Sequence, residues 1–422
     1  MSILKKKSTL SAGFYSARAL LISLGLCTAS FTLWAADQTA TALNDSPAWQ
    51  KTLASAKGQT VYFNAWGGSE TINAYIRWAA EQVEDQYQVT VKQVKITDTG
   101  NVVSRLLAEK SAGRTSSGSV DLVWINGENF KSMKDNGLLA KAYTQQLPNY
   151  LLVDTENKPS TLYDFTTAVD NLEAPWGMAQ MVFMYDTAHL DSHPQDMHTL
   201  LSTVQDNKGR FSYPAPPNFH GTSFIKQALI ELIADKRLLS KAVVKEDFSK
   251  VTAPLWAYLD KLHPLMWRSG RSFPSSAGQM KKLLNNSEIF ISLSFNPNDA
   301  SNAIANDELP ESIKTYVHAK GTLGNTHFVA IPFNAKAKEG AKVFANFLMS
   351  PAAQARKASP QIWGDPTVLA MQKLSEAQRQ SFSDLPLGQA TLSTEQLGTV
   401  LLEPHASWVA ALEQEWLSRY AK

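Results

Sequence analysis

The chain has 422 residues, of which 44% are hydrophobic and 18% are charged. This composition is ordinary for a globular protein and excludes a disordered one, and the length is sufficient for two or three domains with a sizeable core. The formal net charge is only +2, so the charge balance gives no support to a nucleic-acid-binding protein, which would carry a basic patch.

The first segment has the pattern of an export signal. Lysines at 5–7 and Arg18 precede the apolar run ALLISLGLCTASFTLWAA, and small residues end it. Ser and Thr interrupt this run and its length is marginal for crossing a bilayer, so a membrane anchor is the weaker alternative. We therefore interpret residues 1–36 as a signal peptide that is cleaved near Ala36.

Cleavage would change the chemistry of the chain. Residues 1–36 contain four positive charges, no acidic residue and Cys27, the single cysteine. The formal net charge of +2 would become −2, and the mature chain could form neither a disulfide nor a cysteine metal site. A cysteine-free exported chain of this size indicates a protein of the bacterial periplasm.

Residues 37–57 are predicted to form a linker and a first helix. Beyond them, strand and helix patterns alternate, as is typical of an open α/β sheet. Strands are predicted in TVYFNAW (60–66), YQVTVKQVKI (87–96) and SVDLVWI (119–125), and helices at about 70–83, in NVVSRLLAEKSAG (101–113) and in ENFKSMKDNG (128–137). The third strand is an almost unbroken apolar run, which indicates a strand buried in a parallel sheet.

A second α/β region follows. We predict a strand pair, or one long bent strand, around Gly177, and a helix from about Thr222 after a short strand and a proline-rich loop. Further strands are predicted in EIFISLSF (288–295) and THFVAIPFNA (326–335), one helix in KEGAKVFANFLMSPAAQARKA (338–358), and helices in the tail from Thr391. Two such units predict two lobes around a cleft, with ligands beyond the carboxyl ends of the strands.

The stretch VAIPFNAKAKEGAKVFANFLMSPAAQARKA (329–358) carries the most specific pattern of the sequence. A strand that ends in Ile-Pro, then Asn-Ala-Lys, then a helix that ends in Leu-x-Ser-Pro-x-x-Gln resembles the solute-binding proteins of bacterial ABC importers. The matching residues are Ile331, Pro332, Asn334, Ala335, Lys336, Phe347, Leu348, Ser350, Pro351 and Gln354. VYFNAWGG, DLVWINGENFKSMKDNGLLA and WGMAQMVFMYDTAHL resemble the same family, so the resemblance extends from about residue 58 onward.

The resemblance implies an α/β chain with the type II periplasmic binding fold, in which crossover strands join two α/β lobes around a ligand cleft. Lobe 1 would comprise residues 58–172 and about 325–360, and lobe 2 about 173–324 and 361–422. It also implies a monomeric periplasmic protein that captures a small solute by hinge closure and delivers it to the ABC permease subunits in the inner membrane. The subgroup is similar at a distance to binders of polyamines, thiamine and iron.

Enzyme motifs do not support a different reading. No G-x-S-x-G or H-E-x-x-H occurs, and the mature sequence has no cysteine nucleophile, so we expect no enzyme activity and no cofactor. A periplasmic enzyme or a sensor-receptor module with the same fold stays open as the alternative. His189, His193 and His198, with Asp191 and Asp196, could hold zinc, but their spacing fits no standard zinc motif, and we expect no metal.

Two glycines follow the first strand, where a loop could bind phosphate. Gly67 and Gly68 do not form G-x-G-x-x-G, and no G-x-x-x-x-G-K-[ST] occurs, so a nucleotide site is disfavoured. The pair is expected to turn the chain sharply into a helix. The N–H groups of Gly68, Ser69 and Glu70 could bind an anionic group, although the Glu70 carboxylate would compete at the helix N-terminus.

Tryptophans recur at predicted cleft positions. Trp66 and Trp124 follow strands, Trp176 lies at the crossover, and Trp363 lies in a segment that this fold returns to the cleft. Tryptophan faces bind cations and flat rings, and Glu128 would lie nearby, which slightly favours a cationic or aromatic nitrogen compound over a sugar or phosphate. Core packing for some of these tryptophans, and a role for Glu128 only in starting its helix, are the alternatives.

In the second region, the loop NFHGTSF starts a helix, for which Thr222 or Ser223 is the expected N-cap. Polar side chains in this loop and at the end of the next strand could bind the solute from the second lobe. The predicted ligand site comprises Trp66, Gly67, Gly68, Ser69, Glu70, Trp124, Asn126, Glu128, Trp176, Asn218, Gly221, Thr222, Ser294, Asn296 and Trp363.

Overall fold

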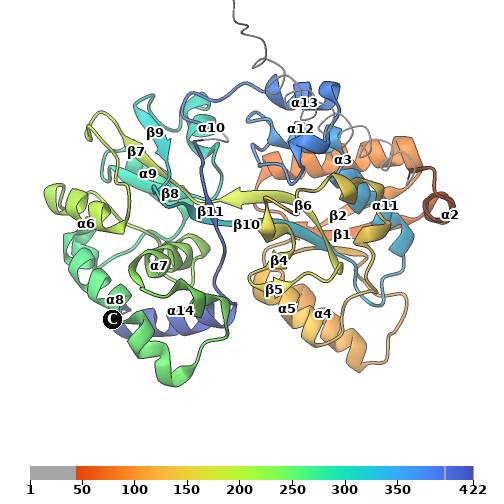
Figure 1. The fold of residues 1–422 in the computed structure, drawn as a ribbon, viewed down its shortest axis with the longest axis horizontal. Helices are drawn as coiled ribbons and strands as arrows, with labels where there is room; N and C mark the ends of the chain where they lie inside the picture. Colours follow the sequence, from red (N-terminus) through yellow and green to blue (C-terminus); the bar gives the residue numbers. More distant parts are fainter. Residues whose placement is uncertain (1–43, 394–395, 422) are drawn as a thin grey trace, which may run out of the picture.

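The computed structural model describes residues 44–393 and 396–421. The chain forms two α/β lobes, and strands pass between them through the middle of the molecule (Figure 1). The predicted signal peptide, with its cleavage near Ala36, lies outside the described residues. Within them, no helix combines the length and the apolar character needed to cross a membrane.

The first lobe is built on a sheet that has the strand order β2-β1-β3-β10 in the described part of the chain, with β6 and β11 both pairing with β10. Strands β1, β2 and β3 are parallel because helices connect them, whereas β10 runs antiparallel to β3 and β6 and parallel to β11. The bounds are β1 Thr60–Trp66, β2 Thr90–Ile96, β3 Leu122–Ile125, β6 Glu173–Gln180, β10 Thr322–Ala330 and β11 Val400–Leu401. The predicted strands at 60–66, 87–96 and 119–125 are thus confirmed, with shorter second and third strands.

Helices cover both faces of this sheet. On one face the core joins Phe63 of β1 to Tyr75 and Phe344 of the covering helices, and on the other it joins Val123 of β3 to Phe130. The first face is covered by α2 (Pro47–Ala56), α3 (Glu70–Tyr87) and α11 (Lys338–Leu348), and the second by α4 (Gly100–Ser111) and α5 (Gly127–Asp135). A short hairpin, β4 (Tyr163–Asp164) and β5 (Thr167–Ala168), follows in the chain.

The single helix predicted at 338–358 is wrong. The structure has two helices there, α11 and α12 (Pro351–Ala358). Pro351 stands at the first position of α12, where its missing N–H is not needed, and the Ser350 hydroxyl caps the new helix by accepting from Ala353 N at 3.3 Å. The Ser-Pro pair therefore starts a second helix instead of continuing the first.

The second lobe has a smaller antiparallel sheet with the order β8-β7-β9. One face packs on α6, α7, α8 and α14, and the other on α9 and α10. The bounds are β7 Val182–Asp186, β8 Ile291–Ser294, β9 Ile313–Tyr316, α6 Met197–Asp206, α7 Phe219–Leu232, α8 Lys245–Leu262, α9 Ala277–Asn285, α10 Asp299–Ala305 and α14 Ser407–Tyr420. The predicted short strand before the proline-rich loop is reduced to a single bridge between Phe211 and Ile291.

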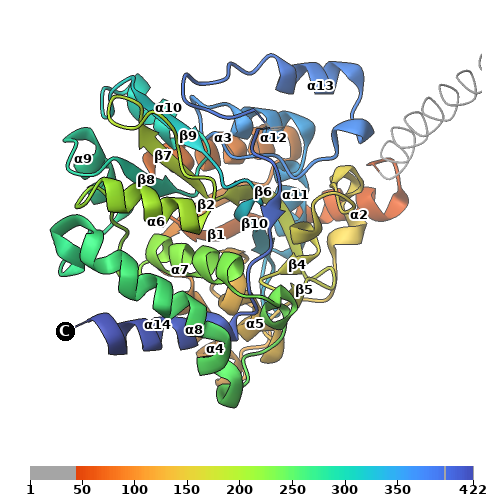
Figure 2. The same ribbon diagram turned by 60° about the vertical axis from the view of Figure 1, so that its left-hand side comes forward.

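The lobes are joined by three passages of the described chain. Strand β6 continues into β7, and β10 returns from the second lobe to the first. The third passage leaves α13 (Glu376–Ser383), reaches β11 and descends to α14 (Figure 2). Trp363, Val368 and Leu374 belong to the core of the first lobe, whereas Trp408 and Trp416 belong to that of the second. The lobe boundaries drawn from the sequence stay a prediction.

Candidate functional site

The direction of the strands decides which loops face each other. Strand β10 runs from the second lobe into the first, and β3 is antiparallel to it, so β3 and its parallel neighbour β1 end toward the second lobe. In the second lobe β8 is antiparallel to β7, which leaves the first lobe, so β8 ends toward the first lobe. The segments after Trp66, Ile125 and Ser294 therefore lie at the inter-lobe side, where the sequence places the candidate site.

The double glycine after β1 is required by packing. A Cβ at Gly68 would lie 2.3 Å from the Trp66 ring, and a Cβ at Gly67 would lie 2.6 Å from Cβ of Lys95. Gly67 N also donates to Ile96 O at 3.0 Å, which extends the pairing of β1 and β2. The glycines thus let the Trp66 ring fold back on the turn, and this ring stays 42% exposed.

The start of α3 already satisfies its own polar groups. The Ser69 hydroxyl is the N-cap and accepts from Ile72 N at 3.4 Å. The exposed Glu70 carboxylate accepts from Arg77 at 2.7 Å and lies 3.8 Å from Lys95. Hydrogen bonds from Arg77 and Asn73 lower the pKa of Glu70. Glu70 is therefore occupied by cations of its own lobe, which weakens its predicted contact with a cationic solute.

Three of the predicted tryptophans form one cluster in the first lobe. The ring centroid of Trp124 lies 5.0 Å from that of Trp176 and 5.7 Å from that of Trp363, and Trp176 and Trp363 are 5.4 Å apart. Trp124 is half-buried, while Trp176 is 0% and Trp363 6% exposed. Trp176 is enclosed by this cluster and by Phe63 and Tyr75, so core packing describes it in this conformation.

A buried ion pair lies against the tryptophan cluster. Lys357 Nζ is 2.7 Å from Asp365 Oδ2 and also donates to Trp176 O, and His327 Nε2 lies 3.2 Å from Asp365 Oδ1. Burial would raise the pKa of Asp365, but the charges of Lys357 and His327 outweigh it and hold that pKa below its usual value. A Cβ at Gly177 would lie 2.0 Å from both ionised groups. Sequence reasoning missed this pair; a glycine at the crossover was its only signal.

The second-lobe loop is held mainly by its own contacts. Asn218, not Thr222 or Ser223, is the N-cap of α7, and its side chain accepts from His220 N at 3.0 Å. The predicted cap is wrong because the helix starts three residues earlier, at Phe219. The Thr222 hydroxyl, 4% exposed as a residue, donates to Glu413 at 2.6 Å. A Cβ at Gly221 would lie 1.8 Å from Pro214 O, so this glycine permits a close backbone contact.

Side chains after β8 bind the first lobe directly. Asn296 Nδ2 donates to Trp363 O at 3.1 Å, and Asn298 Nδ2 donates to Gly364 O at 2.5 Å. Ser294 orients this loop because its hydroxyl accepts from Asn296 N at 3.2 Å. The structure therefore joins Asn296 to Trp363, two predicted site residues, across the lobes. Asn298 was missed although it lies two residues beyond a predicted position.

The segment after β3 is tied to the hairpin β4–β5. Asn126 precedes α5, and Gly127 N donates to both carboxylate oxygens of Asp164 at 2.8 Å. Glu128 is exposed in the first turn of α5. Burial raises the pKa of Asp164 to about 8. The hydrogen bond from Gly127 lowers this pKa, whereas the negative charges of Glu128 and Glu403 raise it further.

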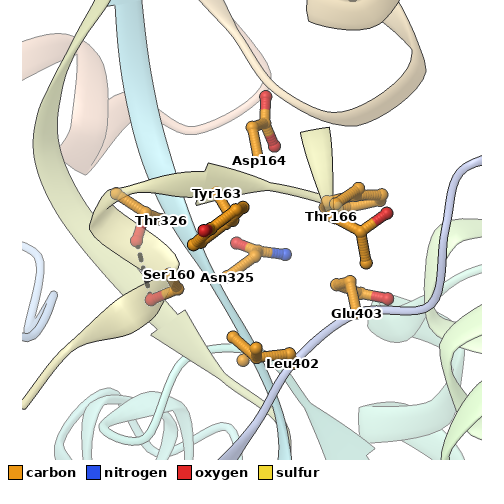
Figure 3. A pocket seen from close by; sticks show the side chains of 10 residues that line it. Ser160, Tyr163, Asp164, Thr166, Asn325, Thr326, Leu402 and Glu403 are labelled. Atoms are coloured by element: carbon orange, nitrogen blue, oxygen red, sulfur yellow. Dashed lines mark hydrogen bonds between the residues drawn. The ribbon is translucent and has the colours of Figure 1, made fainter. Parts of the chain in front are cut away.

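A small cavity lies beside this hairpin, between β10 and the chain that follows β11 (Figure 3). Its volume of about 10 Å³ suits one water-sized group. The Asn325 amide lies in its middle, with Ser160 and Thr326 on one side and Thr166 and Glu403 on the other. Both amide atoms of Asn325, the Thr166 hydroxyl and Glu403 Oε1 are buried and find no hydrogen-bond partner among the described residues. Buried polar atoms are seldom left unpaired, so this cavity is suited to a polar group of a ligand.

The cavity adjoins a contact between the lobes. Lys226 of α7 lies 2.6 Å from Glu403 Oε2, and both side chains are 2% exposed. Lys226 Nζ also lies 5.1 Å from the ring centroid of Phe165 in the first lobe and 6.0 Å from that of Phe219 in the second lobe. Phe219 is 45% exposed. None of these residues was predicted, because the segments that meet here are far apart in the chain.

The histidines and aspartates at 189–198 do not form a metal site in the structure. Within residues 44–393 and 396–421, no group of three or more His, Cys, Asp or Glu side chains is placed to hold a metal ion. His193 instead stacks on Tyr316, with ring centroids 4.6 Å apart, and Asp196 caps α6.

Comparisons with known proteins identify the family. The sequence profile of the family described as "Bacterial extracellular solute-binding protein" matches residues 78–378, which is more than half of the chain. Protein YnjB of Escherichia coli (strain K12) is 45% identical over 373 residues, which are 88% of this chain and 94% of that protein.

Solved structures agree in fold. The spermidine/putrescine ABC-transporter substrate-binding protein PotD of Streptococcus pneumoniae superposes with a TM-score of 0.61 at 14% identity, covering 86% of this chain and 98% of its own. An ABC transporter protein of Clostridium perfringens gives a TM-score of 0.59 at 14% identity, with the same coverage of 86% and 98%. These neighbours confirm the predicted type II periplasmic binding fold. The chain belongs to the family of bacterial extracellular solute-binding proteins.

Proposed function

We propose that the chain captures a small solute in the periplasm by closing its two lobes and delivers it to the permease of an ABC importer. The observation that carries this proposal is the pair of hydrogen bonds from Asn296 and Asn298 to the backbone at Trp363 and Gly364. Both hydrogen bonds link one lobe to the other through side chains, whereas the strands β6 and β10 join the lobes covalently. Side-chain contacts of this kind form and break as lobes rotate. Closure would bring the segments after β1, β3 and β8 together on the solute.

The solute would contact residues that have free surface at the inter-lobe side. Trp66 and Phe219 are large apolar side chains that stay exposed there, at 42% and 45%, and Tyr163 and Leu402 are exposed to a similar extent beside the small cavity. The half-buried Trp124 lies near the end of β3, and Asn126 follows directly after this strand. Tryptophan and phenylalanine faces bind flat rings and cations. We keep these positions as the ligand site, with Glu70 and Trp176 in supporting roles.

The small cavity would bind a protonated nitrogen of the solute. Asn325 Oδ1, Thr166 Oγ1 and Glu403 Oε1 are buried oxygens without a partner among the described residues, and an ammonium group has three donors and the size of a water molecule. Asp164 beside them would add a carboxylate charge, since a cation lowers the pKa of a neighbouring acid. This supports the cationic nitrogen compound favoured by the sequence over a sugar or phosphate.

The test begins with the native protein. Mass spectrometry of small molecules that co-purify with it, from a periplasmic fraction, would name the candidate solute. Small-angle scattering should then show a smaller radius of gyration on adding that compound, without turnover. A radius unchanged across a broad metabolite panel, or conversion of the compound into a product, would contradict the proposal and favour the sensor or the enzyme alternative respectively.

Two further measurements address the site and the location. Asn325→Leu should weaken binding of the identified solute at least about tenfold, because it removes a buried amide partner, while Asn136→Leu at the exposed C-cap of α5 should not. Unchanged affinity in Asn325→Leu would remove the cavity from the site. Sequencing the N-terminus of the periplasmic protein should find a new terminus just after Ala36, and an intact Met1 would contradict export by cleavage.

A further inference from the structure

A larger cavity lies next to the small one and shares Ser160 and Leu402 with it. Its volume is about 680 Å³, within the range typical of small-molecule sites, and none of the predicted ligand-site residues lines it. Its walls come from the first lobe at Lys158 and Met371, from the crossover strand β6 at Met178–Gln180, and from the second lobe at Pro297 and Asn298. The cavity is therefore built at the junction of both lobes with the hinge.

A strap formed by residues 384–393 supplies part of the lining. It begins after α13, whose Phe382 packs against the core of the first lobe. Its other end is fixed to the second lobe, where Thr391 Oγ1 donates to Asn298 Oδ1 at 2.9 Å and Ala390 N donates to the Ser301 hydroxyl at 3.0 Å. The strap is thus anchored on both lobes and holds the wall of the cavity in place.

The lining is largely apolar. A cavity of this kind stabilises apolar groups by removing their surface from water. The apolar side chains are Pro159, Met178, Ala179, Pro297, Ala358, Pro360, Pro366, Met371, Phe382, Leu385, Pro386, Leu387, Leu392, Leu397, Val400 and Leu402.

The lining offers a ligand a positive charge. Its charged residues are Lys158 and Asp365, and both oxygens of Asp365 are already bound, one to Lys357 and the other to His327. Lys158 Nζ donates to Thr367 O at 2.7 Å and to Leu369 O at 3.0 Å, so among the described residues one of its three N–H groups has no partner and can bind a ligand. Burial lowers the pKa of Lys158 to about 8, and the charge of the nearby Asp154 carboxylate opposes this shift.

We propose that this cavity is a second binding site, which takes a small apolar molecule with a single anionic group. The anion binds Lys158 and the apolar part lies against Phe382, Leu385 and the neighbouring apolar wall. Because both lobes and β6 form the walls, a bound molecule resists any rotation that changes the shape of the cavity. The site therefore couples an apolar anion to the hinge, and it adjoins the small cavity of the proposed solute site without including any of the predicted ligand-site residues.

The experiment compares two fluorescent probes that differ in one charge. In the purified full chain, 1-anilinonaphthalene-8-sulfonate should bind saturably at one site and at least about fivefold more tightly than uncharged N-phenyl-1-naphthylamine, since the sulfonate gains a charge-assisted hydrogen bond. Lys158→Met should make the two affinities equal. The matched control Lys208→Met, at an exposed position in the turn that follows α6, should leave both affinities unchanged.

A filled cavity should exclude the probes. Ala358→Trp places a large ring in the cavity from the partly exposed last residue of α12 and should abolish the fluorescence increase, with an unchanged near-ultraviolet circular dichroism spectrum as evidence of folding. Wild-type probe binding in folded Ala358→Trp, or equal affinities of the two probes in the unaltered chain, would overturn the proposal. Neither result depends on solute-induced closure, so the two proposals fail separately.

Discussion

Loss of the Lys357 ammonium is expected to destabilise the first lobe strongly. Lys357 is 0% and Asp365 4% exposed at the side chain, and the two groups are 2.7 Å apart. Lys357→Met would leave the Asp365 carboxylate buried with His327 as its remaining partner. Removing one partner of a buried ion pair costs about 3–5 kcal/mol, against about 0–1 kcal/mol for an exposed pair. We expect a loss of about 3 kcal/mol, since His327 compensates part of the charge.

The assay is urea unfolding followed by tryptophan fluorescence. Trp176 and Trp363 lie 5.0 and 5.1 Å from Lys357 Nζ, so their emission reports on this lobe. The double variant Lys357→Met/Asp365→Asn should recover part of the loss, because both charges are then gone. The control Lys131→Met removes an ion pair whose side chains are 36% and 58% exposed and should change the free energy of unfolding by less than about 1 kcal/mol.

A small effect would refute this account. If Lys357→Met loses less than about 1 kcal/mol, or if the double variant is no more stable than the single one, the ion pair is not the interaction that holds this junction. Gly177→Ala offers an independent check. The new Cβ would lie 2.0 Å from Lys357 Nζ and from Asp365 Oδ2, so this variant should destabilise the first lobe as well.

Further predictions concern the cleft. Trp66→Ala should weaken solute binding with little change in thermal melting, because the ring is 42% exposed, and normal affinity would exclude Trp66 from the site. Trp124→Ala should also lower the free energy of unfolding by about 3 kcal/mol through its ring contacts, and an unchanged urea midpoint would contradict this. Asn298→Ala should enlarge the scattering radius of the unliganded chain; an identical radius would show that its bond to Gly364 does not hold the lobes. Burial raises the folded-state pKa of Asp164 to about 8, so the free energy of unfolding should fall by about 1.4 kcal/mol per pH unit as the pH rises from about 4 to 8. Asp164→Asn should remove this slope when urea midpoints are measured against pH. A slope that persists in the variant would contradict the assignment to Asp164.

Much of the fold could be predicted because its signals are local. The alternation in TVYFNAW and the apolar run LVWI gave strands β1 and β3, and helical spacing gave α3, α4 and α5. The errors were also local. One helix was predicted across Pro351, and the cap of α7 was placed at Thr222 or Ser223 instead of Asn218.

The candidate site could be predicted only in part. The strand-end rule found Trp66, Trp124 and Asn296, because each follows or ends a recognisable strand. It could not find Lys357 or Glu403, whose partners are remote: Lys357 bonds to Trp176 across 181 positions, and Lys226 bonds to Glu403 across 177. The same rule predicted that Glu70 contacts the solute, whereas the Glu70 carboxylate forms ion pairs with Arg77 and Lys95.

The sequence by itself determined the α/β class, the order of the elements and the family pattern around Ile331 and Pro351, because these depend on residues that are neighbours in the chain. Only the tertiary structure decided which side chains meet. It buried Trp176 in the core, placed the Asn325 amide, which has no hydrogen-bond partner in the described part of the chain, in a cavity beside Glu403, and formed a larger cavity where the lobes join. Burial and pairing depend on contacts between distant segments, and no local pattern of residues records those contacts.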